Sequence, residues 1–201
     1  KCIMIKNHIL ITTYANPDLD GVACAVAYAE FLQKKNQNVE AAFFGILHRE
    51  AHFVLRTFGI LQPEDAEKIL LKNPNIILVD ASDTRGIADK INPLNVIEII
   101  DHRKINQSSS FPNAKVQIEL VGSAATLIAE KFFYQNRVIS MASAALLYSA
   151  IISNTANFQA NVTTDRDKKM ARWLLAFFSL PKNYIHDMFA TKSVFEKPLI
   201  N

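Results

Sequence analysis

Cysteine, glycine and proline are scarce in this sequence of 201 residues. The two cysteines, Cys2 and Cys24, lie far apart and form no Cys-x-x-Cys pair, which argues against a disulfide framework and a zinc ribbon. The five glycines and seven prolines are scattered along the chain, as is typical of a compact domain with short loops. No internal repeat or low-complexity tract interrupts this pattern.

Long apolar runs are missing as well. The longest helix-compatible apolar stretch, residues 142–152, is far shorter than the roughly 20 residues that a transmembrane helix needs. The first residues lack a long apolar core and a small-residue cleavage site, so we expect no signal peptide. Since Lys1 is not a Met, we expect natural residues before it. The net charge of +3 is too small to indicate nucleic acid binding, and we expect a cytoplasmic protein with no membrane partner.

Hydrophobic residues make up 50% of the chain, which is enough to bury one sizeable core. Short β-branched segments alternate with segments of helical spacing, and the last third of the chain is helical. We expect strands at residues 8–13, 39–44, 75–80, 96–101 and 115–120, and helices at 21–35, 49–58, 123–134, 140–153, 165–180 and 184–190. This pattern predicts an α/β fold, a mostly parallel sheet with helices on both faces and a helical C-terminal portion.

Acidic side chains follow three of the predicted strands. Asp18 and Asp20 follow the first strand, Asp80 ends the third, and Asp101-His102 ends the fourth. Because ligands of parallel sheets bind at the carboxyl ends of the strands, we expect these groups to converge. Asp18 and Asp20 point the same way if their backbone is extended, since they are two residues apart. Converging carboxylates need cations, and oxygen ligands with an imidazole suit Mn²⁺ or Mg²⁺.

Each of these residues also has a purely structural interpretation. A single Asp after a strand is usually a helix cap or a turn former, and Asp65, Asp83 and Asp89 fit that description. A lone His102 is more often structural than a ligand. Three apolar strands that each end in candidate ligands are harder to explain in this way, so the metal site and the structural alternative both stay open.

Five segments occur in the order typical of one family: NPDLD (16–20), ILVDASD (77–83), IIDHR (99–103), ELVGSAATLIAE (119–130) and SAIISNTANF with TTDRD (149–167). With them the chain resembles the DHH phosphoesterase superfamily, and it is most similar to the N-terminal domain of manganese-dependent (family II) inorganic pyrophosphatases, exopolyphosphatases and prune proteins. Residues 48–60 also resemble the linker helix of those pyrophosphatases. The resemblance implies a DHH-type domain over residues 1–190, a tail at 191–201 similar to the linker to a second domain, a small phosphorylated substrate and a homodimer.

The resemblance further implies two metal sites for Mn²⁺, or for Mg²⁺ or Co²⁺. Asp18 and Asp20 would each ligate one ion, Asp80 would bridge both ions, and His102 would ligate one of them. Asn154 stands at the position of a further ligand, where its amide oxygen can coordinate a hard cation. Such an ion pair lowers the pKa of a shared water and clamps the phosphoryl oxygens of a substrate.

Other implied roles surround these ligands. Asp80, Asp101 and Arg103 would form the catalytic set, in which Asp101 orients His102. Arg103 would also bind a substrate phosphate through its fork of donors. Ser123, in the turn beside the site, would contact the substrate.

Three positions depart from the family pattern. Tyr14 stands where the family has a metal-binding histidine, and a neutral phenol is a poorer ligand than an imidazole. Arg103 replaces the second histidine of the Asp-His-His signature, as in prune-like members. Asn154 replaces an aspartate, so three carboxylates face the charge of two divalent ions. Metal binding should therefore be weaker, and without a second domain in the sequence we expect either an open cleft or a longer natural chain.

Three functions follow in order of preference. The first is a metal-dependent phosphohydrolase with a degenerate site, acting on pyrophosphate, polyphosphate or a similar compound. The second is a catalytically inactive DHH-fold module for binding or assembly, which Tyr14 and Asn154 favour. The third is a phosphodiesterase on short oligonucleotides or cyclic dinucleotides, against which stands the lack of a glycine-rich nucleotide-binding appendage.

Overall fold

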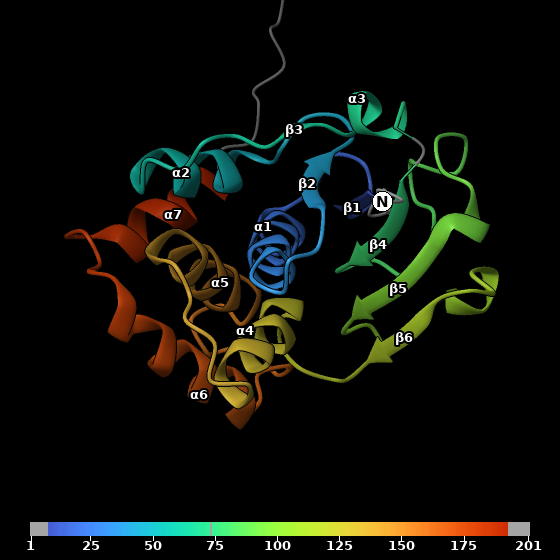
Figure 1. Cartoon of the computed structure of the whole chain (residues 1–201). Coiled ribbons are helices and arrows are strands. Elements are labelled where there is room, and N and C mark those ends of the chain that lie inside the picture. The colour runs from blue at the N-terminus through green and yellow to red at the C-terminus, as the bar shows by residue number, and fades with distance from the viewer. Residues whose placement is uncertain (1–7, 73, 193–201) are drawn as a thin grey trace, which may run out of the picture.

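The computed structural model describes residues 8–72 and 74–192, which form a sheet flanked by helices (Figure 1). The strands are β1 Ile9–Thr12, β2 Val39–Phe43, β3 Glu64–Asp65, β4 Asn75–Val79, β5 Val96–Asp101 and β6 Lys115–Ile118. The helices are α1 Leu19–Gln33, α2 Arg49–Thr57, α3 Ala66–Leu70, α4 Ala124–Tyr134, α5 Met141–Asn154, α6 Asp165–Leu174 and α7 Tyr184–Lys192. Short 3₁₀ turns are η1 Pro93–Asn95, η2 Ser108–Ser110 and η3 Leu175–Phe177.

Every pair of neighbouring strands is parallel, and the strand order is β3-β2-β1-β4-β5-β6. Five strands lie inside the predicted segments, which confirms the parallel α/β fold. The sequence did not predict β3, because Glu64 and Asp65 are exposed acids. It also missed the short helix α3, which Asp65 caps by accepting a hydrogen bond from the backbone N–H of Glu67. The capping interpretation of Asp65 is therefore confirmed.

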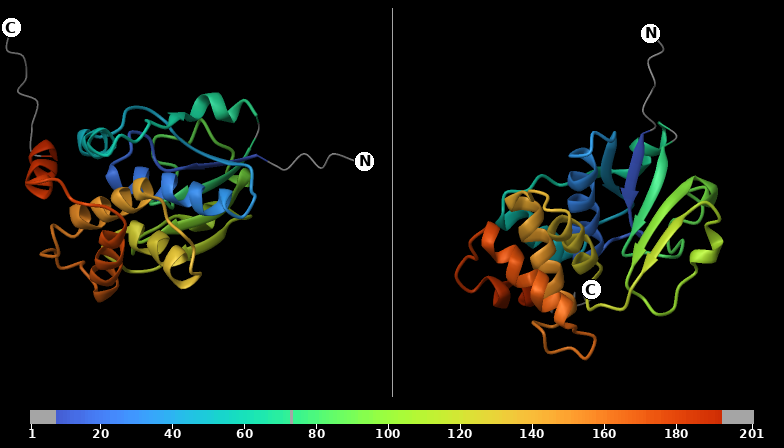
Figure 2. Two further views of the ribbon diagram at one scale, coloured as in Figure 1. Left: turned by 60° about the vertical axis from the view of Figure 1, so that its left-hand side comes forward. Right: turned by 60° about the horizontal axis from the view of Figure 1, so that its bottom comes forward.

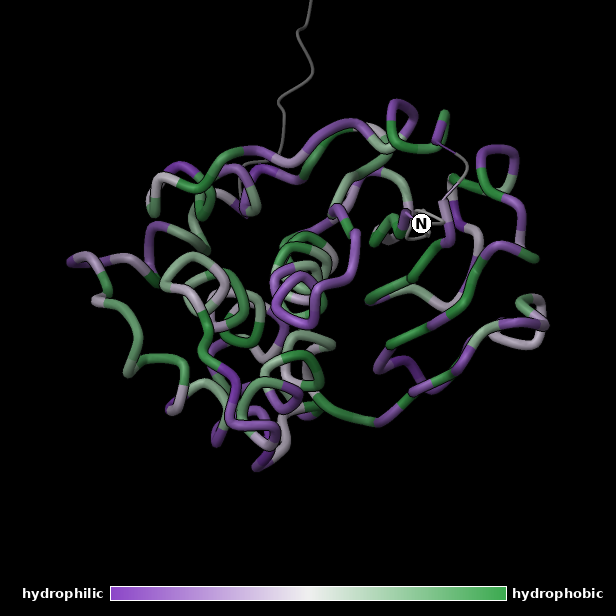
Figure 3. The backbone as a smooth tube through the Cα atoms, viewed as in Figure 1, coloured by the Kyte–Doolittle hydropathy of each residue, from purple (hydrophilic) through white to green (hydrophobic). Residues whose placement is uncertain are grey.

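One face of the sheet packs against a thick helical layer. Ile11 of β1, Ile77 and Val79 of β4 and Ile100 of β5 are buried in a core shared with α1, α4 and α5. α1 lies between the sheet and α5, and its apolar and small residues are buried on almost all sides (Figure 1). Hydrophobic residues accordingly line the strands and the inner helices in the backbone trace (Figure 3).

The opposite face has a thinner cover. The alternate strand residues, Leu10, Ile76, Leu78 and Ile99, form a second buried cluster with residues of α3 and of the segments between β4 and β6. Phe111, just after η2, closes this cluster from the loop before β6. Helices on both faces are thus confirmed, although loops and 3₁₀ turns contribute much of the second layer.

The C-terminal helices extend the thick layer away from the sheet (Figure 2). α6 ends at Leu174, so the helix predicted at 165–180 is too long, because the chain tightens into η3 and Pro181 cannot continue the helix. α7 packs on α2, where the rings of Tyr184 and Phe53 stack with centroids 5.7 Å apart. The predicted linker at 191–201 lies outside the described residues, apart from its first two residues in α7. Across residues 8–72 and 74–192, no helix combines the length and hydropathy of a membrane span.

Candidate metal centre

Three neighbouring strands deliver the predicted site residues to one edge of the sheet. β1, β4 and β5 are adjacent, and their carboxyl ends lead to the NPDLD segment, to Asp80 and to Asp101-His102. Among the described residues, Asp20, Asp80 and His102 bring ligand atoms to within 4.8 Å of one another. The expected convergence is therefore confirmed for these three groups.

Asp18 and Asp20 do not point the same way. α1 begins at Leu19, so Asp18 is its N-cap and accepts a hydrogen bond from the backbone N–H of Gly21 at 3.1 Å. Asp20 lies inside the first turn, and residues two apart on a helix face different directions. The expectation of an extended backbone was wrong here, because the helix starts two residues earlier than its apolar pattern indicates.

Asp20 is fully buried and surrounded by hydrogen-bond donors. Its Oδ1 accepts from the Ser123 hydroxyl and the Ala125 N–H, both at 2.9 Å, and its Oδ2 accepts from the Ala124 N–H at 2.9 Å. Asn154 donates its amide to the same Oδ2 at 2.5 Å. The carboxylate therefore sits at the N-terminus of α4, where the helix dipole favours negative charge.

Asp80 is buried in a left-handed backbone conformation, with φ of 51°. This conformation is uncommon for a residue with a side chain, and it fits a site held by its surroundings. The backbone N–H of Asp80 donates to the Ile100 carbonyl at 2.8 Å, and its own carbonyl accepts from Arg103 Nη2 at 2.6 Å. Burial, reinforced by the charge of Asp20, raises the pKa of the Asp80 carboxyl well above its usual range.

His102 turns one ring nitrogen toward both carboxylates. Its Nδ1 lies 2.9 Å from the carbonyl oxygen of Val121, to which it donates, so Nε2 faces the site. Nε2 is 3.3 Å from Asp80 Oδ1 and 3.9 Å from Asp20 Oδ2. Burial lowers the pKa of His102, but the hydrogen bond with Asp80 and the charge of Asp20 outweigh it and raise the pKa to about 10. Two carboxylates and an imidazole nitrogen are a suitable ligand set for a divalent transition metal.

Arg103 occupies the other side of Asp80. Its Nη2 lies 3.7 Å from Asp80 Oδ1, and its guanidinium carbon is 5.3 Å from the centroid of the Tyr14 ring. Arg85 approaches the same ring at 5.7 Å, so two cations surround one phenol. Burial, together with the charges of Asp18 and Asp80, raises the pKa of the Tyr14 hydroxyl, which stays neutral.

The remaining predicted residues lie behind these groups. Asp101 is fully buried and does not touch the imidazole, since Oδ1 accepts from the His102 backbone N–H at 2.8 Å and Oδ2 from the Ser82 hydroxyl at 2.5 Å. It fixes the backbone after β5, whereas Val121 orients the ring. Ser123 is also fully buried and faces Asp20, so its hydroxyl supports a carboxylate and does not line the open cleft.

The turn between β6 and α4 supports this arrangement and was not recognised in full from the sequence. Asp167 of α6 is fully buried and accepts hydrogen bonds from Gly122 N–H at 2.9 Å and from the Thr126 hydroxyl at 2.5 Å. A Cβ on Gly122 would meet Thr155 at 2.6 Å, so only glycine allows this close approach. Its neighbours in the chain are Val121, which orients His102, and the Ser123 that binds Asp20.

A cavity of about 580 Å³ reaches Asp18 but not Asp20, Asp80 or His102, and it is lined by Asn16, Asp18, Ile46, Leu47, His48, Arg49, Glu50, Thr191 and Lys192. Glu50, at its wall, accepts a hydrogen bond from the Ser153 hydroxyl at 2.6 Å, and Lys192 Nζ lies 3.8 Å from its carboxylate. Burial raises the pKa of Glu50 despite these partners. No sequence pattern indicated this group, because its members come from α2, α5 and α7.

Comparisons with known proteins agree with this geometry. Residues 8–158 match the model of the family described as "DHH family, N-terminal domain". A manganese-dependent inorganic pyrophosphatase of Methanocaldococcus jannaschii is 35% identical over 197 residues, which cover 93% of this chain and 62% of that protein. A "probable manganese-dependent inorganic pyrophosphatase" of Clostridium acetobutylicum is 34% identical over 186 residues, covering 92% of this chain and 60% of that protein.

Solved structures show the same fold. A crystal structure described as a family II inorganic pyrophosphatase of Methanococcus jannaschii matches with a TM-score of 0.75 and 32% identity, covering 92% of this chain and 62% of that chain. An exopolyphosphatase-related protein from Bacteroides fragilis matches with a TM-score of 0.69 and 16% identity, covering 94% of this chain and 58% of that chain. At this identity the match supports the fold alone. The chain spans less than two thirds of the length of these relatives.

Proposed function

Because this chain belongs to the DHH family, we propose that it is a metal-dependent phosphohydrolase acting on pyrophosphate, polyphosphate or a similar small phosphate compound. The observation that carries the proposal is the buried group of Asp20, Asp80 and His102 at the carboxyl ends of β1, β4 and β5. The pyrophosphatases to which it is similar are described as manganese-dependent, so Mn²⁺ is the proposed ion, with Mg²⁺ and Co²⁺ as alternatives. A bound divalent ion would supply Lewis acidity toward water and phosphoryl oxygens.

The residues of the chain would prepare the site for that ion. His102 holds a proton in the metal-free protein, because its pKa is raised to about 10, and would release that proton from Nε2 on metal binding. Its Nδ1–H stays on the Val121 carbonyl and keeps Nε2 directed at the ion. Asp20 and Asp80 would supply negative oxygen ligands, and Asn154 would stand next to them as a neutral neighbour.

We propose that the cavity at Asp18 receives part of a phosphate compound. His48, Arg49 and Lys192 line it together with Asp18, so basic side chains face the space in which phosphoryl oxygens would lie. Arg103, whose Nη2 donates to the Asp80 carbonyl, adds a planar group of donors next to the metal ligands. We propose that Arg103 contacts the phosphate and that positioning and charge supply most of the catalysis.

A specific observation also favours the non-catalytic alternative. The Asn154 amide donates to Asp20 at 2.5 Å, so the buried carboxylate has a partner without any ion. Tyr14, whose ring centroid lies within 5.7 Å of the guanidinium carbons of Arg85 and Arg103, replaces an expected ligand with a cation-binding ring. These contacts are expected in a catalytically inactive DHH-fold module for binding or assembly, because the protein's own side chains would then partner the site residues in place of metal ions.

These alternatives are separated by measuring the release of inorganic phosphate from pyrophosphate and from tripolyphosphate, and the release of mononucleotides from a short dinucleotide, each with Mn²⁺, Co²⁺ and Mg²⁺. We expect hydrolysis of pyrophosphate or tripolyphosphate with Mn²⁺, a loss of at least about 100-fold in Asp80→Asn, and no change in the exposed control Asp89→Asn. Hydrolysis of the dinucleotide alone would support a phosphodiesterase. The double variant Tyr14→His with Asn154→Asp tests for a decayed enzyme. If neither the wild type nor this variant hydrolyses any substrate, the binding module is correct and the hydrolase proposal is wrong.

A further inference from the structure

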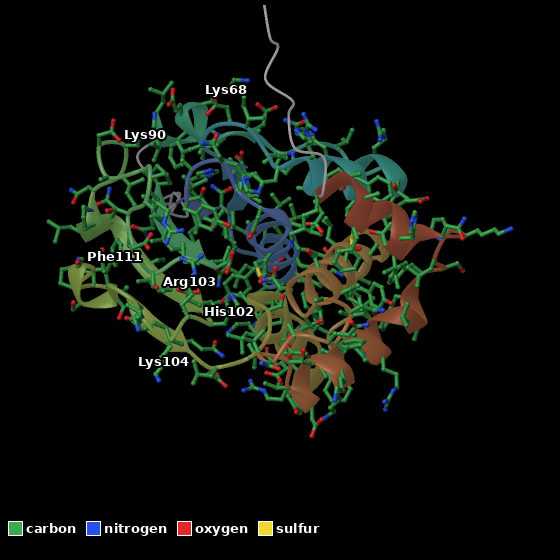
Figure 4. All side chains as sticks on the ribbon, turned by 180° about the vertical axis from the view of Figure 1, so that it is seen from behind. Lys68, Lys90, His102, Arg103, Lys104 and Phe111 are labelled. Carbon is green, nitrogen blue, oxygen red and sulfur yellow. The ribbon has the colours of Figure 1, made fainter. Side chains whose placement is uncertain are left out.

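Asp80 Oδ1 faces two different groups. On one side His102 Nε2 is 3.3 Å away, in the group with Asp20 that can hold an ion. On the other side Arg103 Nη2 is 3.7 Å away. In Figure 4 the side chains of His102 and Arg103 both point toward the interior, whereas Lys104 points outward. A positive charge that cannot leave the protein therefore stands at one side of the same carboxylate.

The guanidinium is held firmly in that place. Its Nη2 donates to the Asp80 carbonyl at 2.6 Å, its Nε lies 3.8 Å from Asp101 Oδ1, and its guanidinium carbon lies 5.3 Å from the centroid of the Tyr14 ring. Arg103 Nη1 is buried and lies 4.0 Å from Asp83 Oδ2. Among the described residues, Nη1 has no hydrogen-bond partner. The position therefore combines a fixed cation with a donor that is still available to an anion.

The same side offers little to a metal ion. Tyr14 presents a neutral phenol, and the guanidinium carbons of Arg85 and Arg103 lie 5.7 Å and 5.3 Å from the centroid of its ring. Of the other carboxylates near it, Asp83 and Asp101 lie within 4.0 Å of Arg103, and Asp18 is committed in part to capping α1. A divalent ion here would have no imidazole ligand and would be repelled by the charge of Arg103.

We propose that the Arg103 guanidinium takes the place of a second metal ion beside Asp80, so that this protein binds a single divalent ion, at Asp20, Asp80 and His102. The inference rests on the metal-dependent function proposed above and states which group supplies each positive charge in that site. One cation is an exchangeable metal, and the other is a side chain whose free Nη1 receives a phosphoryl oxygen. The two-ion arrangement that the sequence resemblance implies is replaced by one ion and one arginine.

The number of bound ions tests this directly and does not depend on activity. The protein is equilibrated with excess Mn²⁺ and desalted, and manganese per chain is counted by mass spectrometry, with electron paramagnetic resonance distinguishing isolated from paired Mn²⁺. We expect one Mn²⁺ per chain with the spectrum of an isolated ion. Two ions with a spectrum of an exchange-coupled pair would overturn the proposal, and so would none.

Variants then test whether Arg103 and Tyr14 are the reason that only one Mn²⁺ binds. We expect the double variant Tyr14→His with Arg103→His to bind a second Mn²⁺, while Tyr14→His alone stays at one because the guanidinium remains. The matched control is Lys104→His, which adds a histidine at the neighbouring exposed position and should leave the count at one. A second ion in Tyr14→His alone would show that Arg103 does not exclude it. Circular dichroism confirms folding, and the wild-type count stands if the double variant does not fold.

The failure of this inference is distinct from the failure of the proposed function. One Mn²⁺ per chain without hydrolysis of any phosphate compound would support the single-ion site and reject the hydrolase. Hydrolysis with two bound ions would support the hydrolase and reject the single-ion site. Absence of bound Mn²⁺ in the wild type would contradict both.

Discussion

The two sides of Asp80 balance its charge in different ways. The His102 side contains the fully buried Asp20, and its imidazole and carboxylates are fixed by the Val121 carbonyl and by the N-terminus of α4. The Arg103 side is more open, and besides one hydrogen bond to the Asp80 carbonyl, the partners of the guanidinium are the Tyr14 ring and ion pairs at up to 4.0 Å. A buried site with directed hydrogen bonds can select an ion by geometry, whereas a half-buried guanidinium supplies charge with less demand on geometry.

This contrast shows how a family site can change without losing its scaffold. The strand order and the turn around Gly122 keep the His102 side in place, so ligands there depend on residues far along the chain. The Arg103 side depends mainly on side chains from two strand ends, which single substitutions alter. We therefore expect substitutions that support the first side to have larger effects than those at the second.

The largest expected effect comes from the buried carboxylate that supports the His102 side. Both carboxylate oxygens of Asp167 accept hydrogen bonds, from Gly122, Thr126 and Thr164, at 2.5–2.9 Å. Asp167→Asn replaces one of these acceptor oxygens with an amide donor. Unsatisfied buried donors cost about 1–3 kcal/mol each, so we expect a loss of about 3 kcal/mol in the free energy of unfolding. Urea denaturation followed by circular dichroism measures it.

The matched control lies on the Arg103 side. Asp83 accepts from the Arg85 backbone N–H at 3.1 Å and pairs with its guanidinium at 3.3 Å near the surface. Asp83→Asn keeps an acceptor oxygen and removes a partly screened ion pair, so we expect a loss below about 1 kcal/mol. Equal losses in the two variants would contradict the difference between the sides.

The next largest effect is the pH dependence of Mn²⁺ binding. The pKa of His102 is raised to about 10, so the metal-free imidazole is protonated near neutral pH and must lose this proton when it ligates the ion. Apparent affinity should therefore rise by about tenfold per pH unit, about 1.4 kcal/mol, as pH increases toward 10. Calorimetric titration at several pH values below the pKa of about 10 measures the slope.

His102→Gln provides the control for this slope. Without the imidazole, Mn²⁺ should bind at least about tenfold more weakly, and the part of the pH dependence that comes from the histidine proton should be lost. A flat pH profile in the wild type would mean that His102 is already neutral, and it would contradict the strong electrostatic coupling to Asp80 and Asp20.

The sequence predicted the convergence of the site because the topology determines it. In a parallel sheet, apolar strands that end in Asp80 and in Asp101-His102 bring those residues to one edge. The family resemblance placed Asn154 near them, and the structure gives it a hydrogen bond to Asp20 over 134 residues of sequence separation. These agreements rest on strand order and on ordered motifs, both of which are visible in the sequence.

The contacts that specify the roles were not predictable in the same way. The divergence of Asp18 and Asp20 depends on where α1 begins, which capping decides within one or two residues. The contact of Arg103 with Tyr14 depends on side-chain rotamers at two strand ends. The hydrogen bond from Gly122 to Asp167 joins β6–α4 to α6, and no local pattern reports such a distant pair.

The smallest of these effects is expected at Asn154, where one substitution should lower stability without Mn²⁺ and increase the stabilisation by Mn²⁺. Its amide donates to Asp20 Oδ2 at 2.5 Å, so Asn154→Asp replaces a donor with a second carboxylate. Repulsion in this partly buried position should destabilise the metal-free protein by about 1 kcal/mol. In the presence of Mn²⁺ the added carboxylate becomes a further ligand, so the increase in unfolding temperature caused by Mn²⁺ should exceed that of the wild type. Thermal unfolding with and without Mn²⁺ measures both, and Asn154→Ala, which loses the donor without adding charge, should show no such gain. A Mn²⁺-induced shift in Asn154→Asp that is no larger than that of the wild type would mean that this position lies outside the reach of the ion.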